Sequence, residues 1–324
     1  MISPPNSLPP SEQDLELAAL RSAYEAGTFN KAAYSREIWK IHQRLFEYSQ
    51  FLSDTNVDAI EISREGVAFR LRDPQLKLFC TPNDQRHVAI ASLNFHNYES
   101  DEVHAVLRLI KACSVVFDIG ANVGFYSIAI GQHFPDTKII AFEPVPATYR
   151  ELQRNLALND IGNVTTFNQG LSDRACEASF YFDPTVTGAA SGAPLGAEFA
   201  TTEVLTCPVE PLDDFVDRTG ILPDFIKCDV EGGEFNVFKG AEKTLDRAKP
   251  MVFTEMLRKW AARFGYHPNE IIAFFKNLGY QCFVLQDAML HPFAEMTEET
   301  VETNFFFLHT QRHLEMVRFL GLLK

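Results

Sequence analysis

From Ser114 onward, short apolar runs alternate with segments of helical periodicity, and this alternation constrains the fold more than any other feature of the chain. Strands separated by helices lie parallel and have helices on both faces. We therefore expect an α/β fold with a mostly parallel seven-stranded sheet, in which the last two strands form an antiparallel edge hairpin. The expected strands are 115–119, 138–143, 163–168, 225–229, 251–256, 280–285 and 304–309. The expected helices begin at 124 and span 146–159, 234–246 and 268–278.

The residues before this alternation follow other periods and predict an N-terminal extension over 1–95, ahead of a main domain over 96–324. The extension begins with helical patterns and changes to alternating apolar and polar residues over 58–95, where we expect short strands that include 88–93. Between 174 and 210 the main domain is interrupted by a glycine- and alanine-rich stretch that lies between two strand-like runs. Loops of this kind often carry function, so we expect a lid or substrate insertion there.

Two helices are expected at the start of the extension. Ser11 and Asp14 have the spacing of a capping box, which predicts a first helix that runs to about Tyr24. In a second helix, over 31–51, apolar residues step by four and three along one face, which then packs on the main domain or forms a homodimer contact. These residues are Tyr34, Ile38, Ile41, Leu45, Tyr48 and Leu52.

The charge balance restricts the partners of this chain. The 43 Asp and Glu residues exceed the 29 Lys and Arg residues, and the net charge of −14 repels a polyanion, so we expect no nucleic-acid partner. The six cysteines have no paired spacing, which argues against a zinc site and a disulfide scaffold and favours a reducing compartment. Because there is neither a basic and apolar leader nor a run of about 18 apolar residues, we expect a cytoplasmic protein with no membrane partner.

A glycine-rich turn follows the first predicted strand of the main domain, at Asp118-Ile119-Gly120-Ala121-Asn122-Val123-Gly124. Glycine lets the backbone approach a ligand closely, and in such sheets ligands bind outside the carboxyl ends of the strands. A dinucleotide fingerprint would need glycine at 122 and 125, where this chain has Asn122 and Phe125. Asp118 would also repel a diphosphate and attract a cationic ligand, so this turn favours S-adenosylmethionine as the cofactor.

Other predicted cofactor contacts follow the neighbouring strands. Glu143, followed by Pro144, ends the second strand and is suited to accept hydrogen bonds from both ribose hydroxyls. The third strand ends near Ser172 and Asp173, where we expect the adenine ring. Upstream of the turn, Glu102 is a candidate contact for the methionine moiety, as are Tyr98 and Glu99, and helix capping is the alternative role. With Gly120, Asn122 and Gly124, these residues complete the predicted cofactor site.

Three segments together resemble the FkbM-type methyltransferase family, which has a D-x-G-A-N-x-G turn, an F-E-P strand end and a K-x-D-x-E-G-x-E strand end. The resemblance implies a Rossmann-like class I methyltransferase fold. It also implies S-adenosylmethionine-dependent O-methylation of a hydroxyl on a small metabolite, polyketide or sugar. Gly233 stands where alanine is usual. The three segments lie at 118–124, 142–144 and 227–234. The resemblance covers roughly 98–307 and includes similar residues at 212–215 and 252–255.

Methyl transfer to an aliphatic hydroxyl needs a base that takes the proton. Asp229, Glu231 and Glu234 lie within six residues of one another, and crowded carboxylates raise one another's pKa. We expect Asp229 and Glu231 to be catalytic, the alternative being that they fix the loop or bind the ligand ammonium. His267 and His291 are further candidate bases. Neighbouring carboxylates also suit Mg²⁺, but we assign no metal ligands, because the cluster lacks an obvious second carboxylate group in a fixed position.

Three other functions stay open: N-methylation, methylation of a protein or nucleic acid, and cofactor binding without catalysis. Macromolecular methylation is disfavoured by the net charge and by the absence of an Asn/Asp-Pro-Pro-Tyr/Phe motif where Asp229-Val230-Glu231-Gly232 stands. The expected acceptor is a small molecule or a glycan.

Overall fold

The computed structural model describes residues 16–82, 84–95, 98–110, 115–183, 185–196 and 201–315. The capping box expected at Ser11 and Asp14 lies outside these residues. The chain divides into two compact units, Met1–Thr55 and Asn56–Lys324. Among the described helices, none has both the length and the apolar character needed to cross a membrane.

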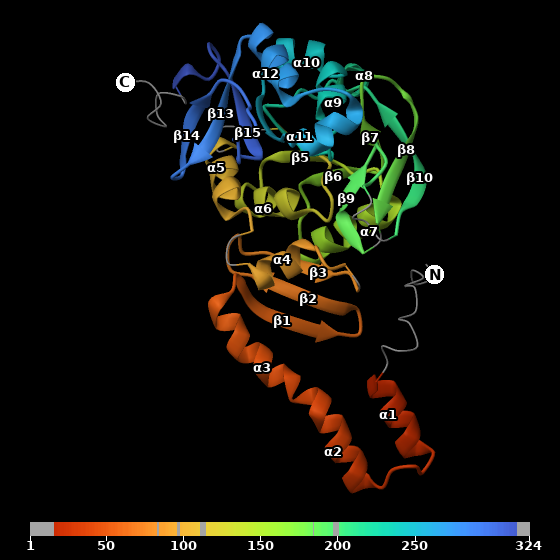
Figure 1. Ribbon diagram of the computed structural model, residues 1–324. Helices are drawn as coiled ribbons and strands as arrows, with labels where there is room; N and C mark the ends of the chain where they lie inside the picture. The colour runs from red at the N-terminus through yellow and green to blue at the C-terminus, as the bar shows by residue number, and fades with distance from the viewer. Residues whose placement is uncertain are drawn as a thin grey trace. The chain divides into compact units, whose positions relative to one another are not determined.

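The described part of the first unit is helical. Helix α1 spans Glu16–Glu25, α2 spans Lys31–His42 and α3 spans Arg44–Phe51 (Figure 1). The single helix expected over 31–51 is therefore interrupted, at Gln43. Asn30 caps the start of α2, because its side-chain oxygen accepts a hydrogen bond from the Ala33 N–H at 2.9 Å.

The second unit begins with a three-stranded antiparallel sheet of β1 (Val57–Ser63), β2 (Gly66–Leu71) and β3 (Lys77–Cys80). Asn155 of helix α7 (Pro146–Leu158) and Asn159, the residue that caps the end of that helix, anchor the last strand of this sheet to the main domain. The side-chain oxygen of Asn155 accepts a hydrogen bond from the Phe79 N–H, and that of Asn159 accepts one from the Lys77 N–H, each at 2.8 Å. These bonds attach the small sheet to the second compact unit, which begins at Asn56. The expected start of the main domain near residue 96 stays a prediction.

The strand expected over 88–93 is wrong, because Val88–Asn94 forms helix α4. The side chain of His87 caps this helix by accepting a hydrogen bond from the Ala89 N–H. The buried residues Val88, Ala89, Ser92 and Leu93 recur at helical spacing. A short apolar run of this length is consistent with either a strand or a helix, and here the cap and the packing favour the helix.

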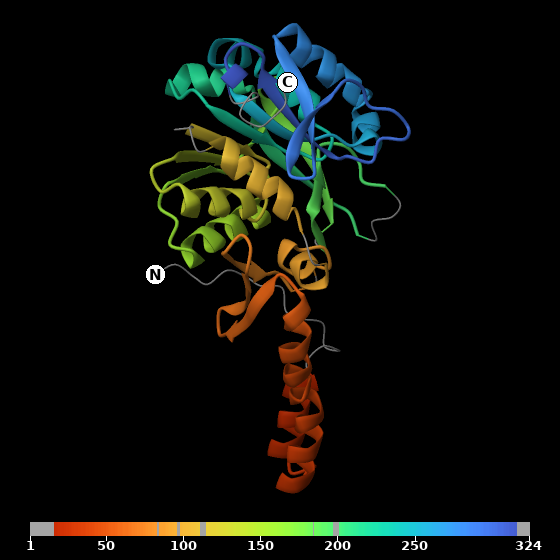
Figure 2. The same ribbon diagram turned by 90° about the vertical axis from the view of Figure 1, so that its left-hand side faces the viewer.

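The main sheet has eight strands in the order β14-β13-β15-β12-β11-β4-β5-β6 (Figures 1 and 2). Counted along the chain, the five parallel strands follow the doubly wound order 3-2-1-4-5, with the switch point between β4 and β11. The expected Rossmann-like class I methyltransferase fold is confirmed. The parallel strands are β4 (Val115–Ile119), β5 (Lys138–Phe142), β6 (Val164–Phe167), β11 (Phe225–Cys228) and β12 (Met251–Glu255).

The antiparallel end of the sheet differs in detail from the expectation. Strand β15 (Asn304–His309) lies between β12 and β13 (Tyr280–Gln286), so it is not an edge strand. The edge hairpin consists of β13 and an additional strand, β14 (Met289–Phe293), which makes the count eight instead of seven.

Helices lie on both faces of the sheet, as expected (Figure 2). One face has α5 (Ser100–Ile110), α6 (Phe125–His133) and α7 (Pro146–Leu158). The other has α8 (Leu212–Thr219), α9 (Glu234–Lys239), α10 (Glu242–Ala248) and α12 (Pro268–Asn277), with the short α11 (Arg258–Ala261) after β12. The helix expected over 234–246 is divided at Gly240, whose backbone packs so closely on the Ser172 carbonyl that an added Cβ would lie 2.0 Å from its oxygen.

Aromatic residues fill the space between the sheet and these helices. Phe117, Phe142 and Phe215 pack edge to face with ring centroids 5.0–6.0 Å apart. Phe275 stacks on Phe307 at 4.2 Å. Each such side chain contributes about 1.5–3 kcal/mol when buried, and this packing holds the strand ends in fixed positions.

The insertion expected over 174–210 forms strands. Strands β8 (Cys176–Asp183), β9 (Val186–Ser191) and β10 (Glu203–Glu210) join the short β7 (Gly170–Leu171) in a second sheet of order β7-β10-β8-β9. This sheet continues the chain directly from the end of β6 and returns it to α8.

Candidate functional site

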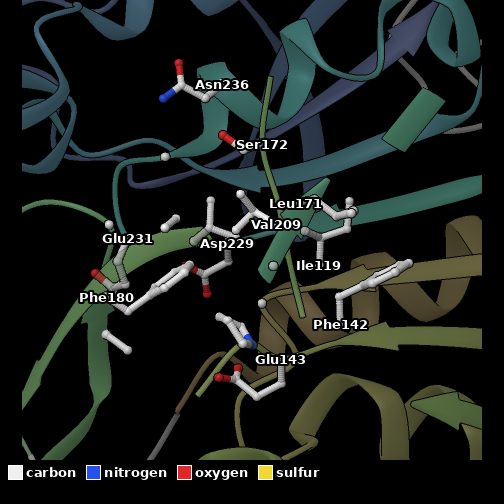
Figure 3. Close-up of a pocket in the computed structure, with 18 of the residues that line it drawn as sticks. Ile119, Phe142, Glu143, Leu171, Ser172, Phe180, Val209, Asp229, Glu231 and Asn236 are labelled. Atoms are coloured by element: carbon white, nitrogen blue, oxygen red, sulfur yellow. The ribbon is translucent and has the colours of Figure 1, made fainter. Parts of the chain in front are cut away.

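A cavity of about 540 Å³ lies at the carboxyl ends of β4, β5, β11 and β12, next to the switch point (Figure 3). Its lining includes residues that we singled out from the sequence: Tyr98, Glu99, Gly120, Asn122, Glu143, Pro144, Ser172, Asp173, Asp229 and Glu231. Asp118, Gly124 and Glu102 are not among its lining residues.

The glycine-rich turn after β4 is held by backbone hydrogen bonds. The N–H groups of Gly120 and Ala121 both donate to the Phe142 carbonyl, and the Asn122 N–H donates to Oε2 of Glu143 at 3.0 Å. Asn122 has a φ of 49°, which is uncommon for a residue other than glycine. Its side-chain Oδ1 is buried and accepts no hydrogen bond from the described residues, so the turn presents a free acceptor at the cavity wall.

The glycines of the turn are required by contacts within the protein. A Cβ on Gly120 would lie 1.8 Å from the Asp229 carbonyl oxygen, and one on Gly124 would lie 2.7 Å from Leu152. Both residues also have positive φ values, 73° and 95°. Gly120 lines the cavity, so the expected close approach of a ligand to this turn stays a prediction, and the same glycines also make room for the loop after β11 and for helix α7.

Asp118 lies behind the turn. It is fully buried, accepts a hydrogen bond from the Ser127 hydroxyl at 2.6 Å and lies 3.5 Å from Nζ of Lys227. Lys227 also donates to the Gly120 carbonyl at 2.6 Å and lies 3.7 Å from Asp229. Burial alone would lower the pKa of Lys227, but the carboxylates of Asp118, Asp229 and Glu99 outweigh it and raise the pKa.

The direct attraction that we expected between Asp118 and a cationic ligand stays a prediction, although Asp118 does not line the cavity. Lys227 compensates the charge of Asp118, and the pair fixes the position of the turn.

Glu143 ends β5 at the cavity wall with both carboxylate oxygens already in use. Oε1 accepts a hydrogen bond from the Val145 N–H at 2.9 Å, and Oε2 accepts the one from Asn122. Burial raises the pKa of Glu143 to about 7, although these two bonds oppose the shift. Each oxygen keeps a second lone pair for a ligand, because an ionised carboxylate has about four acceptor positions.

Ser172 and Asp173 line the opposite end of the cavity, after β7. The Ser172 N–H donates to the Glu210 carbonyl at 3.0 Å, which ties this loop to β10. Leu171 and Phe142 line the same part of the cavity and provide apolar surface (Figure 3).

Asp229 and Glu231 meet a third carboxylate, that of Glu255 at the end of β12. One oxygen from each of the three side chains lies within 4.8 Å of the others, an arrangement that could hold a metal ion. Burial, followed by the charge of Asp229 and the charges of other nearby acids, raises the pKa values of Glu231 and Glu255 well above the usual range. Glu231 also has a φ of 54°, a strained conformation that places it at the cavity.

Glu255 is the functional candidate that our sequence reasoning did not single out. Glu255 ends β12, which pairs with β11, the strand that precedes Asp229. Ligands bind outside the carboxyl ends of such strands, and this rule, which located Glu143 and Asp229 at the cavity, also applied to Glu255. Glu255 adds a carboxylate from a different strand to the pair of Asp229 and Glu231, and the sequence did not identify this additional group.

Upstream of β4, Glu99 lines the cavity in place of Glu102. The Tyr126 hydroxyl donates to Oε2 of Glu99 at 2.8 Å, which orients the carboxylate. Burial and the charge of Asp229 raise the pKa of Glu99 to about 7. Glu99 has a φ of 49°, so three cavity residues, Glu99, Asn122 and Glu231, share the left-handed backbone conformation.

Glu234 and His267 have positioning roles. Oε1 of Glu234 accepts hydrogen bonds from the N–H groups of Val230 and Gly232 at 2.9 and 3.1 Å, which fixes the turn that carries Glu231. The side chain of His267 caps α12 by accepting from the Asn269 N–H. Neither residue lines the cavity, nor does His291, so the two histidines are not placed as bases.

The insertion forms one wall of the cavity. Gly188, Ala190 and Gly192, on and just after β9, line it together with Phe180 of β8. The Ser191 hydroxyl donates to the Glu231 carbonyl at 2.7 Å, so β9 is bonded directly to the turn that carries the carboxylates.

Comparison with known proteins bears on this architecture. The sequence model of the methyltransferase FkbM domain matches residues 118–282, about half of the chain. The chain is 27% identical over 146 residues to Methyltransferase 1 of Beauveria bassiana, which covers 40% of this chain and 59% of that protein. It is 28% identical over 148 residues to Hexuronic acid methyltransferase AglP of Haloferax volcanii, which covers 45% of this chain and 58% of that protein. The chain thus spans about three fifths of the length of these relatives.

Among solved structures, the chain is similar to the crystal structure of Methyltransferase FkbM from Methylobacillus flagellatus KT. The two are 18% identical with a TM-score of 0.39, and the alignment covers 68% of this chain and 53% of the other. The match to the family's sequence model begins at Asp118 in β4 and ends in β13, so it includes the strands that border the cavity. This chain belongs to the methyltransferase FkbM domain family.

Proposed function

We propose that this protein is an S-adenosylmethionine-dependent methyltransferase that methylates a hydroxyl of a small metabolite, polyketide or sugar. One observation carries the proposal: a single cavity joins the turn with Asn122, the Glu143 carboxylate and the cluster of Asp229, Glu231 and Glu255. A cofactor end and a proton-accepting end are therefore within one site.

The residues present fit S-adenosylmethionine. Oδ1 of Asn122 is a buried acceptor without a partner among the described residues, and the lining carboxylates of Glu99 and Asp229 favour a cationic ligand. Glu143 would accept hydrogen bonds from the ribose hydroxyls, and the loop of Ser172 and Asp173 would bound the adenine ring. When bound, the cofactor supplies an electrophilic methyl group on a sulfonium.

Glu231 is our first candidate for the base. Burial and the charge of Asp229 raise the pKa of Glu231, which makes its carboxylate a stronger base, and its turn is held on both sides, by Glu234 and by Ser191. In the reaction the acceptor oxygen forms a bond to the methyl carbon as the carbon–sulfur bond breaks, and the hydroxyl proton passes to the carboxylate. Asp229 and Glu234 would raise the basicity of Glu231 through their negative charge, and the charge of Glu231 in turn raises the pKa of Glu255.

Two observations support the proposed class of acceptor: the side chains of the cavity wall that β9 forms, and the similarity to one relative. Gly188, Ala190 and Gly192 leave that wall without bulky side chains, which provides room for a polyhydroxylated ring. The similarity to a hexuronic acid methyltransferase supports a sugar as the acceptor.

Two measurements test this proposal. Calorimetry should show that the protein binds S-adenosylmethionine and not NAD, and tighter binding of NAD would overturn the cofactor assignment. Incubation with a methyl-labelled cofactor and panels of hydroxylated metabolites, glycans, peptides and RNA should label a hydroxylated small molecule. Binding without label in any panel would indicate a cofactor-binding module without catalysis.

Glu231→Gln tests the base. Loss of a general base lowers turnover by about 10²–10⁴-fold, and cofactor affinity should remain within a few-fold. Glu242→Gln on the exposed start of α10 is the matched control and should keep full turnover. Glu255→Gln distinguishes an electrostatic role, for which we expect a smaller loss, and unchanged turnover in EDTA would exclude a metal at the carboxylate cluster.

A further inference from the structure

Within the described part of the first unit, the helices carry large apolar side chains that are exposed. None of the residues of α1, α2 or α3 is buried. Leu45 is 54% exposed and Tyr48 is 46% exposed, and Trp39, Phe46 and Phe51 are exposed by more than half. Short helices gain most of their stability in water from packing an apolar face, so these helices need a partner surface.

The apolar residues along α2 and α3 have the spacing of a coiled coil. Tyr34, Ile38, Ile41, Leu45, Tyr48 and Leu52 recur in alternating steps of four and three residues, which is the a and d pattern of a heptad. We refer to these six residues as the seam. The break at Gln43 keeps right-handed helical dihedrals, with φ −59° and ψ −24°, so α3 continues the direction of α2 closely.

Helix α1 covers only the first part of the seam. The ring of Tyr24 in α1 stacks on that of Tyr34 at 4.6 Å, and Tyr34, Ile38 and Ile41 are partly buried. Leu45 and Tyr48 continue the same spacing but are exposed. The 10 described residues of α1, Glu16–Glu25, leave Leu45 and Tyr48 exposed.

The charge of residues 16–55 indicates which kind of partner these helices can bind. Residues 16–55 have five Lys or Arg and five Asp or Glu, so they are neutral within a chain of net charge −14. Pairs such as Arg44 and Glu47, 3.1 Å apart, balance the charge locally. Helices that bind membrane surfaces are typically rich in Lys and Arg on the polar face, which these are not. A second copy of the neutral segment can approach it without the repulsion expected between the acidic remainders.

We propose that two copies of this chain associate through the second half of the seam, with Leu45 and Tyr48 at the centre of the contact. A heptad seam is self-complementary, because a and d side chains insert between those of an identical helix. The two helical hairpins together would form a four-helix bundle around a two-fold axis. The interface uses none of the residues that line the cavity.

Sedimentation and light scattering on the full chain test this proposal. The wild type should have twice its chain mass of 36.6 kDa at tens of micromolar concentration and should dissociate on dilution. The double variant Leu45→Glu, Tyr48→Glu should stay monomeric at the same concentrations. Phe46→Glu is the matched control, because it adds the same charge to an exposed apolar position of α3 outside the seam, and it should remain dimeric.

Three results would overturn the proposal: a monomeric wild type at 100 µM or more, a double variant that still dimerises, or a control that dissociates equally. A second double variant, Leu45→Ser with Tyr48→Ser, removes the apolar contact without adding charge and should also be monomeric, with circular dichroism to check that the main domain is folded. Sedimentation of a monomeric wild type with phosphatidylglycerol vesicles would identify a membrane as the occupant instead.

Discussion

Lys227 and Asp118 occupy paired positions on the neighbouring parallel strands β11 and β4, and Nζ of the lysine lies 3.5 Å from Oδ1 of the aspartate. Both side chains are almost completely buried, at 4% and 0% exposure. The same ammonium donates to the Gly120 carbonyl. One buried cation therefore links the end of β4, the glycine-rich turn and the loop that carries Asp229.

Removal of the Lys227 ammonium should lower the free energy of unfolding. Lys227→Met leaves the Asp118 carboxylate buried without its counter-charge, which typically costs about 3–5 kcal/mol in the free energy of unfolding. Urea denaturation measures the loss. Lys239→Met is the control, because Lys239 is half exposed and lies 4.0 Å from Asp173, so its loss should change stability by at most about 0.5 kcal/mol. Equal losses in both variants would contradict a structural role for the buried pair.

Gly120→Ala should also be strongly destabilising. The φ of 73° is unfavourable for alanine by about 1–2 kcal/mol, and the added Cβ would collide with the Asp229 carbonyl oxygen. Gly162→Ala provides the comparison, since a Cβ there meets no atom within 4 Å. Thermal unfolding should show a large decrease in Tm for the first variant and almost none for the second, and similar Tm values would refute the close approach of the two loops.

Glu143→Gln should weaken cofactor binding. A hydrogen bond to a charged group contributes about 1.5–3 kcal/mol, so the Kd for S-adenosylmethionine should rise by about tenfold or more. Calorimetry measures this change, with Glu177→Gln on the exposed start of β8 as the control. Because Glu143 also accepts bonds from Asn122 and Val145, the Tm of the variant must be compared as well. An unchanged Kd would remove Glu143 from the cofactor site.

The raised pKa of Glu234 predicts that the stability of the protein depends on pH. Burial raises this pKa to about 7, against three opposing backbone hydrogen bonds, so the folded state binds a proton that the unfolded state releases near pH 4.5. Its contribution to stability is therefore complete below about pH 4.5 and is lost as the pH rises through about 7. The Tm should fall between pH 5 and pH 8, and Glu234→Gln should reduce that fall. If Glu242→Gln reduces it as much, the effect does not arise from Glu234.

The order of the main sheet was largely predictable from local sequence patterns. Short, mostly apolar runs such as 115–119 and 225–229 indicate strands that are covered on both faces when helical periods separate them, because those helices provide parallel crossovers. Because the carboxyl ends of such strands share one edge, Gly120, Glu143 and Asp229 were expected at a common site, and the cavity brings them together. The helix at 88–93 was mistaken for a strand, and strand β14 was missed, because short apolar runs fit more than one structure.

The sequence by itself determined which strand ends carry carboxylates, since strand and turn patterns depend on near neighbours. Only the tertiary structure decided what each carboxylate faces. Asp118 contacts Lys227 from another strand, Glu99 and not Glu102 lines the cavity, and Glu255 joins Asp229 across β11 and β12. These outcomes depend on the direction of each side chain and on contacts between residues that are distant in the sequence. Asp118 and Lys227, for example, are more than a hundred positions apart. Local periodicity does not encode such contacts.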